Sequence, residues 1–363
     1  LYRILGGIGV GLASMISPLY IAEIAPPDER GRLVTLQQIA IVTGILLVYF
    51  VNYFIASQGT DAWLLSTGWR YMLASEAIPA ALFFILMLMA PDTPRWFVLK
   101  GQNDKALSIL CRITDETTAQ ATLAEIKETL VVQTRPLLSF GGLVLFVGIM
   151  LSIFQQLVGI NAVLYYAPTI FKSMGASTDT PFLQTVIVGV ANMAFTLVAL
   201  VTVDRWGRKP LLITGGAIMA VAMFALGALF YNAPHASNGA LDVTAAASRW
   251  ALVAIVGYIA GFSLSWGPVV WVLLSEIFPN SIKSTAMAIA VAAQWIANLF
   301  VSWSFKVLDG STMLNATFNH AFAYWVYGAM SVLAALFVLR FVPETKQRNL
   351  ESIQNIWAKS PAA

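Results

Sequence analysis

The stretch from Phe154 to Pro168 reads FQQLVGINAVLYYAP and places several polar side chains in a segment otherwise apolar enough to span a bilayer. An amide in hydrocarbon is costly without a hydrogen-bond partner, so several amides in one membrane helix indicate a polar ligand, a water-filled cavity or a contact between helices. On a 3.6-residue repeat Gln155, Gln156 and Gly159 share one face, and Asn161 lies further along. A helix contact explains any single amide, whereas the cluster favours a polar cavity.

The composition indicates an integral membrane protein. Hydrophobic residues make up 58% of the 363 residues and charged residues only 11%, against about a quarter charged in soluble proteins. Apolar runs that match the roughly 20 residues of a membrane-crossing helix recur along the chain, whereas a β-barrel would show alternating segments of about ten residues. The net charge of +3 is too small and dispersed to favour a nucleic-acid partner. The single Cys111 excludes an intrachain disulfide.

The apolar runs predict an all-α membrane protein with nine visible transmembrane helices. Basic residues gather in alternate loops, such as Arg30 with Arg32 and Arg205 with Arg208. By the positive-inside rule these loops and the tail are cytoplasmic, so the chain begins outside and ends inside. The predicted spans are residues 1–22, 34–57, 70–90, 138–171, 182–203, 210–231, 250–278, 284–306 and 321–342.

Two motifs recur at nearly the same offset, which indicates a duplicated half. They are EIAP at 23–26 with Arg30, which returns as EIFP at 276–279 with Lys283, and PDT at 91–93, which returns as PET at 343–345. The second copies fall within a six-helix half, whereas the first copies end helices one and three of the visible front. The chain also opens at Leu1, already inside an apolar run. We therefore expect a major facilitator fold of twelve helices with three N-terminal helices missing.

These patterns divide the chain into four parts. The connector is polar, and its segments DKALSILCRI and QATLAEIKETL carry apolar residues at helical spacing, which predicts short cytoplasmic helices. So short a segment is not expected to form a soluble domain. The parts are a truncated N-terminal half with three transmembrane helices at 1–90, the connector at 91–137, a C-terminal six-helix half at 138–342 and a cytoplasmic tail at 343–363.

Five motifs together resemble the sugar porter family of the major facilitator superfamily. They are PDTPRW at 91–96, QQLVGIN at 155–161, DRWGRKP at 204–210, WGPVVWVLLSEIFP at 266–279 and PETK at 343–346. The resemblance covers essentially all of the chain in order. DRWGRKP alone would only predict a tight turn between two membrane helices.

The resemblance implies a secondary active transporter, not an enzyme, that moves a monosaccharide by alternating access with proton symport. A pentose such as D-xylose is the expected sugar. The expected surroundings are the lipid bilayer of the cell inner membrane, with the C-terminus in the cytoplasm. We expect a monomer that needs no cofactor.

Carried over onto this sequence, the family's sugar contacts are amides and indoles. A carboxamide both donates and accepts hydrogen bonds, and an indole offers a flat apolar face and an N–H, so both suit a sugar. None of these side chains is charged, which favours a neutral polyol. Packing roles stay open for Gln38 and Trp295. The set is Gln38, Gln155, Gln156, Asn161, Trp271, Gln294 and Trp295.

The resemblance also implies proton-coupling residues and a cytoplasmic gate. Arg3 and Glu76 lie in apolar segments at depths that allow pairing, and in the family such residues surround a proton-carrying aspartate of the first helix. An interfacial anchor is the other interpretation of Arg3. The gate would hold the two halves together through ion pairs that break on switching. The gate residues are Glu23, Arg30, Asp204, Arg205, Arg208, Glu276 and Glu344.

Two other functions stay open. An uncoupled sugar facilitator would carry an apolar or amide residue in place of the first-helix aspartate. A membrane sugar sensor would usually carry a long signalling tail, whereas only a short one follows Val342.

Two sequence features resemble cofactor sites without fitting one. The glycines at 6, 7, 9 and 11 do not match GxGxxG and lie in a membrane span, so no dinucleotide site is expected. His235 and His320 are isolated on outer loops without ligand-like spacing, so no metal site is expected.

Overall fold

The protein is helical throughout the part of the chain that its computed structural model describes, which comprises residues 2–25, 30–131, 136–173, 179–234, 245–279 and 282–346. Those ranges contain no strand, so the all-α prediction is confirmed. The elements are α1 (Tyr2–Ile24), α2 (Arg30–Ala56), α3 (Asp61–Trp63), η1 (Leu64–Gly68), α4 (Trp69–Ser75), α5 (Ala77–Met89), α6 (Pro94–Leu99), α7 (Asn103–Leu110), α8 (Glu116–Val131), α9 (Gly142–Leu157), α10 (Ile160–Ser173), α11 (Asp179–Trp206), α12 (Arg208–Tyr231), α13 (Ala245–Gly261), η2 (Phe262–Trp266), α14 (Gly267–Ile277), α15 (Lys283–Asp309), α16 (Thr312–Phe318) and α17 (Phe322–Phe341).

Nine helical segments of the described ranges are long and apolar enough to cross a membrane, as the sequence predicts. The third span differs most from its predicted start at residue 70, because the helix already begins before Leu64 and runs through the π-helical turn η1. The same span is interrupted at Glu76, which joins α4 to α5. Pro79 follows shortly after, and its missing N–H cannot bond the carbonyl four residues earlier.

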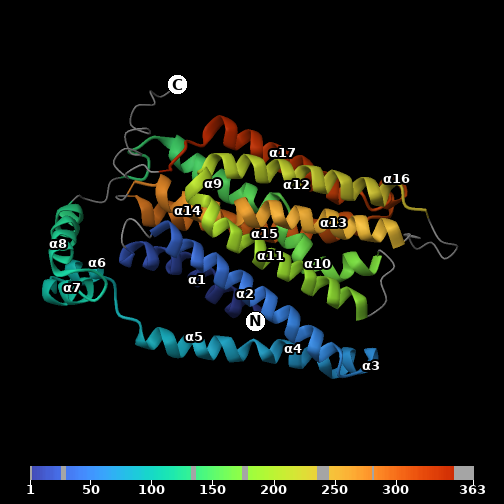
Figure 1. Ribbon diagram of the computed structural model, residues 1–363, viewed down its shortest axis with the longest axis horizontal. Helices are drawn as coiled ribbons and strands as arrows, with labels where there is room; N and C mark the ends of the chain where they lie inside the picture. Colours follow the sequence, from blue (N-terminus) through green and yellow to red (C-terminus); the bar gives the residue numbers. More distant parts are fainter. Residues whose placement is uncertain are drawn as a thin grey trace.

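The six rear spans, α9 to α17, pack around one hydrophobic core. Between 39% and 67% of each of their apolar windows is buried, against 6% or less for the three front spans. At the centre of this core the fully buried Trp266 donates its indole N–H to Leu212 O at 2.9 Å. In Figure 1 these helices form the closely packed upper part of the molecule.

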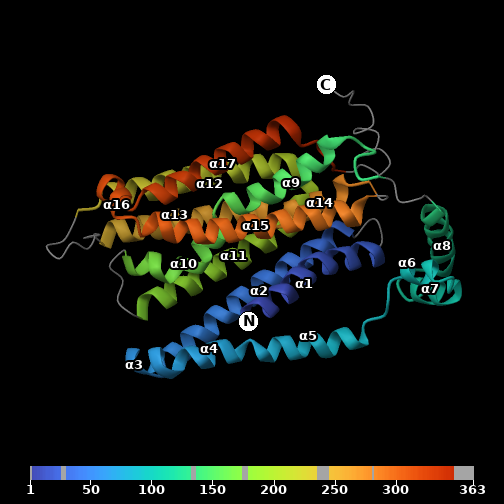
Figure 2. The same ribbon diagram turned by 180° about the vertical axis from the view of Figure 1, so that it is seen from behind.

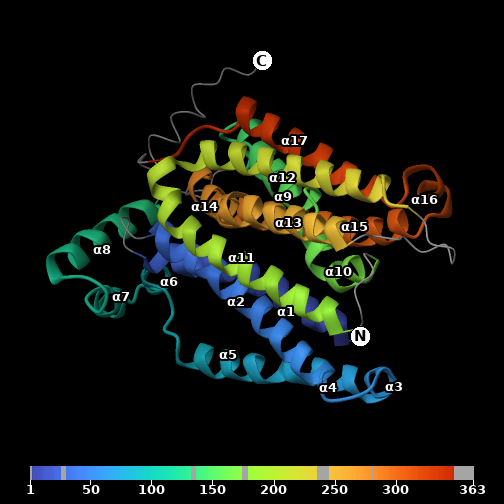
Figure 3. The same ribbon diagram turned by 45° about the vertical axis from the view of Figure 1, so that its right-hand side comes forward.

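The front helices lie on one side of this bundle. Helix α2 runs along α11 (Figure 3) and also contacts α14, and α1 contacts α2 and α15. Segment α4–α5 lies at the lower edge in Figure 2, and neither α4 nor α5 contains a buried residue. Its exposed side chains, such as Ile78 and Leu88, are apolar and suit contact with lipid or other helices.

The connector forms three short helices beyond one end of the bundle (Figure 1). Helix α6 is capped by Thr93, whose side-chain oxygen accepts the Trp96 N–H. Tyr20 on α1 donates its hydroxyl to Pro91 O at 2.8 Å, which fixes the chain entering α6. Helices α7 and α8 share a small hydrophobic cluster, separate from the core of the rear bundle, which consists of Ala106, Leu110, Ala119, Leu123 and Ile126. The four-part division of the chain stays a prediction.

We predict that Gly148→Ala destabilises the rear bundle, because an added Cβ would lie 2.3 Å from the ring of the buried Phe278. Overpacking of this kind costs about 1–3 kcal/mol. The matched control is Gly257→Ala, whose added Cβ meets nothing within 4 Å. Because alanine has a higher helix propensity than glycine, this variant should be slightly more stable than the parent. Thermal unfolding of both variants in detergent tests this, and equal melting temperatures would contradict the close packing of α9 on Phe278.

Candidate functional site

A helix break brings three of the predicted amides together. Helix α9 ends at Leu157 and α10 begins at Ile160, with Gly159 between them at a φ of 93°. Across this break Asn161 Nδ2 donates to Gln156 Oε1 at 2.6 Å. Gln156 Nε2 in turn donates to Gln155 Oε1 at 3.4 Å. The three side chains therefore form an amide row with a fixed direction of donation.

The amide row ends on a second helix interruption, the π-helical turn η2. Gln155 is 2% exposed, and its Nε2 donates to Trp266 O at 3.0 Å and to Gly267 O at 3.3 Å. Pro268 lies next in the chain and lacks an N–H, so it cannot bond the carbonyl four residues earlier. The carbonyls that orient Gln155 therefore belong to the two residues at which η2 passes into α14.

Gln38 approaches the same place from α2. A Cβ added to Gly267 would lie 3.4 Å from Gln38 Nε2. Gln38 and Gln155 therefore lie around the same peptide, one from the front helices and the other from the rear bundle.

The other three predicted sugar contacts lie on α14 and α15. Trp271 and Gln294 are buried, and Gln294 Oε1 has no hydrogen-bond partner among the residues that the structure describes. Trp295 is 36% exposed. Within the described ranges no hydrogen bond joins these three side chains to the amide row, so their part in one site stays a prediction.

A cavity of about 310 Å³ lies between α2, α10 and α11. Its walls are mostly apolar, and the buried Asn52 Oδ1 in its wall lacks a hydrogen-bond partner within the described part of the chain. None of the seven predicted sugar contacts lines it. The lining residues are Ile45, Val48, Tyr49, Asn52, Leu164, Tyr165 and Thr185.

The two predicted proton-coupling residues are both exposed. Arg3 lies in the first turn of α1, and Glu76 lies at the break between α4 and α5. No ion pair joins them within the part of the chain that is described. Their coupling role stays a prediction.

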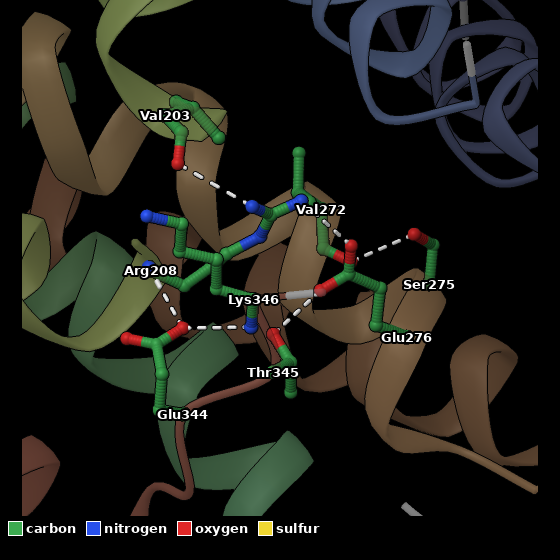
Figure 4. A network of polar contacts seen from close by, with 8 residues as sticks. All are labelled: Val203, Arg208, Val272, Ser275, Glu276, Glu344, Thr345 and Lys346. Carbon is green, nitrogen blue, oxygen red and sulfur yellow. Dashed lines mark hydrogen bonds and ion pairs between the residues drawn. The ribbon is translucent and has the colours of Figure 1, made fainter. Parts of the chain in front are cut away.

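Part of the predicted gate forms a polar network at one end of the rear bundle (Figure 4). Arg208 is 6% exposed, and its Nη2 lies 3.0 Å from Glu276 Oε1 in an ion pair. Thr345 donates its hydroxyl to the other oxygen of Glu276 at 2.6 Å. Because both oxygens of this partly buried carboxylate are used, the ends of α12 and α14 and the tail are held together.

The tail also caps two helix ends. The Glu344 carboxylate accepts the backbone N–H groups of Arg208 at 3.1 Å and Lys209 at 3.0 Å, and so caps the start of α12. Lys346 donates its ammonium to Arg205 O at 2.7 Å, near the end of α11. Gly207 has a φ of 92°, and a Cβ there would lie 2.8 Å from Glu344, so only glycine suits this turn.

The structure joins some of the predicted gate residues and leaves others untested. Arg208, Glu276 and Glu344 lie in one network, and Arg205 contributes its backbone carbonyl. The side chains of Glu23, Arg30 and Asp204 lie outside the described part, as does His235. The network described here connects elements of the rear half only, so its action between the halves stays a prediction. The sequence interpretation missed Thr345 and Lys346, although the motif PETK contains both.

The fold and the buried amide row define a helical membrane carrier. The chain belongs to the sugar transporter family, since the family described as "Sugar (and other) transporter" matches residues 1–357. The D-xylose-proton symporter of Escherichia coli is 54% identical over 360 residues, which cover 98% of this chain and 71% of that protein. The glucose facilitated diffusion protein of Zymomonas mobilis is 47% identical, with 98% and 74% covered.

Solved structures agree on the fold. The chain is similar to a major facilitator superfamily proton:xylose symporter, XylE, bound to 6-bromo-6-deoxy-D-glucose, with a TM-score of 0.83 and 52% identity over 98% of this chain and 73% of that one. The inward-open conformation of XylE from E. coli gives a TM-score of 0.77 at 50% identity, with 98% and 72% covered. The major facilitator fold and the sugar porter prediction are therefore confirmed.

We predict that acid weakens the tail contacts through Glu344. Partial burial raises the pKa of this carboxyl, but hydrogen bonds from the backbone N–H groups of Lys346, Arg208 and Lys209 outweigh it and hold the pKa below the ordinary value of about 4.5. Because the folded pKa is the lower one, the stabilisation is complete above that ordinary value and is lost as pH falls through the folded pKa. The melting temperature measured from neutral to acidic pH should fall in this window.

Glu344→Gln removes the titrating charge at this position. Its melting temperature should be lower than that of the parent at neutral pH, and the difference should shrink in acid. The exposed Glu116→Gln on α8 is the control and should follow the parent curve. A Glu344→Gln curve parallel to the parent at all pH values would contradict the capping role.

Proposed function

We propose that the protein carries a monosaccharide, D-xylose, across the inner membrane by alternating access, together with a proton. The substrate and the coupling follow the D-xylose-proton symporter, which shares 54% identity with this chain. The seven predicted sugar contacts and the coupling role of Arg3 and Glu76 belong to this proposal. No enzymatic step and no cofactor form part of it.

The amide row is the observation that carries the proposal. Its direction runs from Asn161 through Gln156 and Gln155 to the carbonyl of Trp266. At the open end Asn161 is only partly buried, and within the described residues its own Oδ1 and second N–H form no further bond. A sugar hydroxyl is donor and acceptor at once, so it can satisfy both.

An unpaired acceptor on α15 supports a ligand with hydroxyl groups. Gln294 Oε1 is buried without a partner in the described part of the chain, and such an atom costs about 1–3 kcal/mol unless a donor reaches it. The amides around the row are neutral, which favours an uncharged sugar over a phosphate or an amino acid. A hydroxyl of the bound sugar is the donor we propose for Gln294.

The network around Arg208 and Glu344 would then brace the cytoplasmic end of the rear half. Basic side chains in the loops support that orientation, with the C-terminus in the cytoplasm. When two bundles rock around a central site, each must move as a rigid body. Tail caps on α11 and α12 supply such rigidity. A single copy of the protein contains the whole proposed site and would act as a monomer.

An uncoupled facilitator is the second candidate. The observation in its favour is the 47% identity to a glucose facilitated diffusion protein. Both candidates use the same sugar site, so the amide row does not separate them. Only the response of transport to a proton gradient does.

We predict that the purified protein in proteoliposomes accumulates labelled D-xylose when the outside is acidic. With one proton per sugar, a gradient of one pH unit supports up to about tenfold accumulation. A protonophore should reduce the final level to that outside. Equal uptake with and without the gradient would favour the facilitator, and no uptake of any sugar would contradict both candidates.

We predict that Gln155→Ala weakens D-xylose binding at least about tenfold, because the variant loses the bonds to η2 and leaves buried groups without partners. Isothermal calorimetry or intrinsic tryptophan fluorescence measures the affinity. The control is Gln58→Ala, which removes an exposed amide after α2. Unchanged affinity in Gln155→Ala at normal thermal stability would remove the amide row from the sugar site.

A further inference from the structure

The break between α9 and α10 leaves one backbone carbonyl to be satisfied from elsewhere. Hydrogen bonding of α10 resumes with Val163 N donating to Gly159 O at 3.1 Å, so Val158 O lies outside the α10 ladder. Val158 is fully buried. A buried carbonyl in a membrane protein needs an internal donor. The donor that reaches it comes from a helix distant in sequence.

Tyr258 on α13 is that donor. It is fully buried, and its hydroxyl lies 2.7 Å from Val158 O. A buried tyrosine hydroxyl needs a partner of its own, so each group satisfies the other. This single bond ties α13 to the last residue before Gly159.

Tyr327 on α17 covers the break from another helix. A Cβ built on Gly159 would lie 2.5 Å from the Tyr327 ring, and the positive φ of Gly159 further requires glycine. The break is therefore held by Tyr258 through a hydrogen bond and by Tyr327 through packing. Tyr258→Phe removes the hydrogen bond and keeps the ring in place. The packing contact of Tyr327, in contrast, can be removed only by a smaller side chain, which would leave a cavity.

Asn161 lies two residues beyond Gly159, in the first turn of α10. Its 2.6 Å bond to Gln156 crosses the break, so a small rotation of that turn about Gly159 would lengthen it. Farther along α10, Tyr49 donates to Leu164 O at 2.9 Å and Tyr166 donates to Ser302 O at 3.3 Å. These outer contacts keep α10 in place, so loss of the Tyr258 hydroxyl loosens the first turn alone.

We propose that Tyr258 is a positioning residue for the sugar site, whose hydroxyl holds the first turn of α10 at the angle that joins Asn161 to Gln156. Tyr258 itself bonds a backbone carbonyl and no member of the amide row. The inference rests on the proposed sugar function of that row. It adds a residue from α13 to the elements that decide sugar affinity.

A double-mutant cycle with Tyr258→Phe and Asn161→Ala tests the proposal, with D-xylose affinity as the readout. Tyr258→Phe alone should weaken binding about five- to tenfold. In the Asn161→Ala background the same change should cost less than about twofold, because the group it positions is absent. Equal losses in both backgrounds, or no loss in either, would overturn the proposal.

Tyr324→Phe is the matched control for this cycle. Tyr324 is as deeply buried as Tyr258 but lies on α17, stacked on Phe230 with ring centroids 5.0 Å apart. Its variant should keep the parent affinity. An equal loss in Tyr324→Phe would mean that affinity follows general packing of the core, and would overturn a specific role for Tyr258.

A second measurement works without sugar. Hydrogen–deuterium exchange of the backbone amides at 160–163 reports on the first turn of α10. Tyr258→Phe should speed exchange there and leave the exchange of residues 164–173 as in the parent, and unchanged exchange in the first turn would overturn the proposal. If the parent binds no sugar, the proposed function fails while the exchange result still decides the role of Tyr258.

Discussion

A backbone carbonyl that a helix interruption exposes inside a bilayer must find a donor within the protein, and this constraint organises the candidate site. Two helix interruptions lie near one another, at Gly159 and at η2. Tyr258 donates to Val158 O at the first, and Gln155 donates to Trp266 O where η2 passes into α14. Each interruption is therefore stabilised by a side-chain hydrogen bond from another helix. They orient the amides that a polar solute would meet.

Unsatisfied backbone groups also determine the contacts at the end of the rear bundle where α11 turns into α12. The turn between α11 and α12 leaves N–H groups at one helix start and carbonyls at the other helix end. The turn itself supplies no side-chain cap at Gly207. Glu344 and Lys346 supply both caps from the tail, and the Arg208–Glu276 ion pair links this corner to α14. Rigidity at the rim thus depends on residues that follow the last span.

Hydropathy was enough to predict the nine spans, because a helix in lipid needs a long apolar run whatever its neighbours are. It was not enough to predict that residues 138–171 form two helices. Glycine is common inside membrane helices, so Gly159 does not by itself mark a helix end. The Tyr327 ring that packs against Gly159 is distant in sequence. The amides Gln155, Gln156 and Asn161 could be predicted as a cluster because they are close in sequence. Their direction of bonding could not, since Trp266 O is a backbone atom without any sequence signature.

Gly207 of the α11–α12 turn leaves the space that the Glu344 carboxylate of the tail fills. A Cβ built at 207 would lie only 2.8 Å from that carboxylate. The two positions are therefore constrained differently. Glycine is required at 207 by its positive φ whatever residue stands at 344, whereas the carboxylate at 344 needs the space that this glycine leaves. Substitution at 344 removes only the cap, but substitution at 207 disturbs both the turn and the cap.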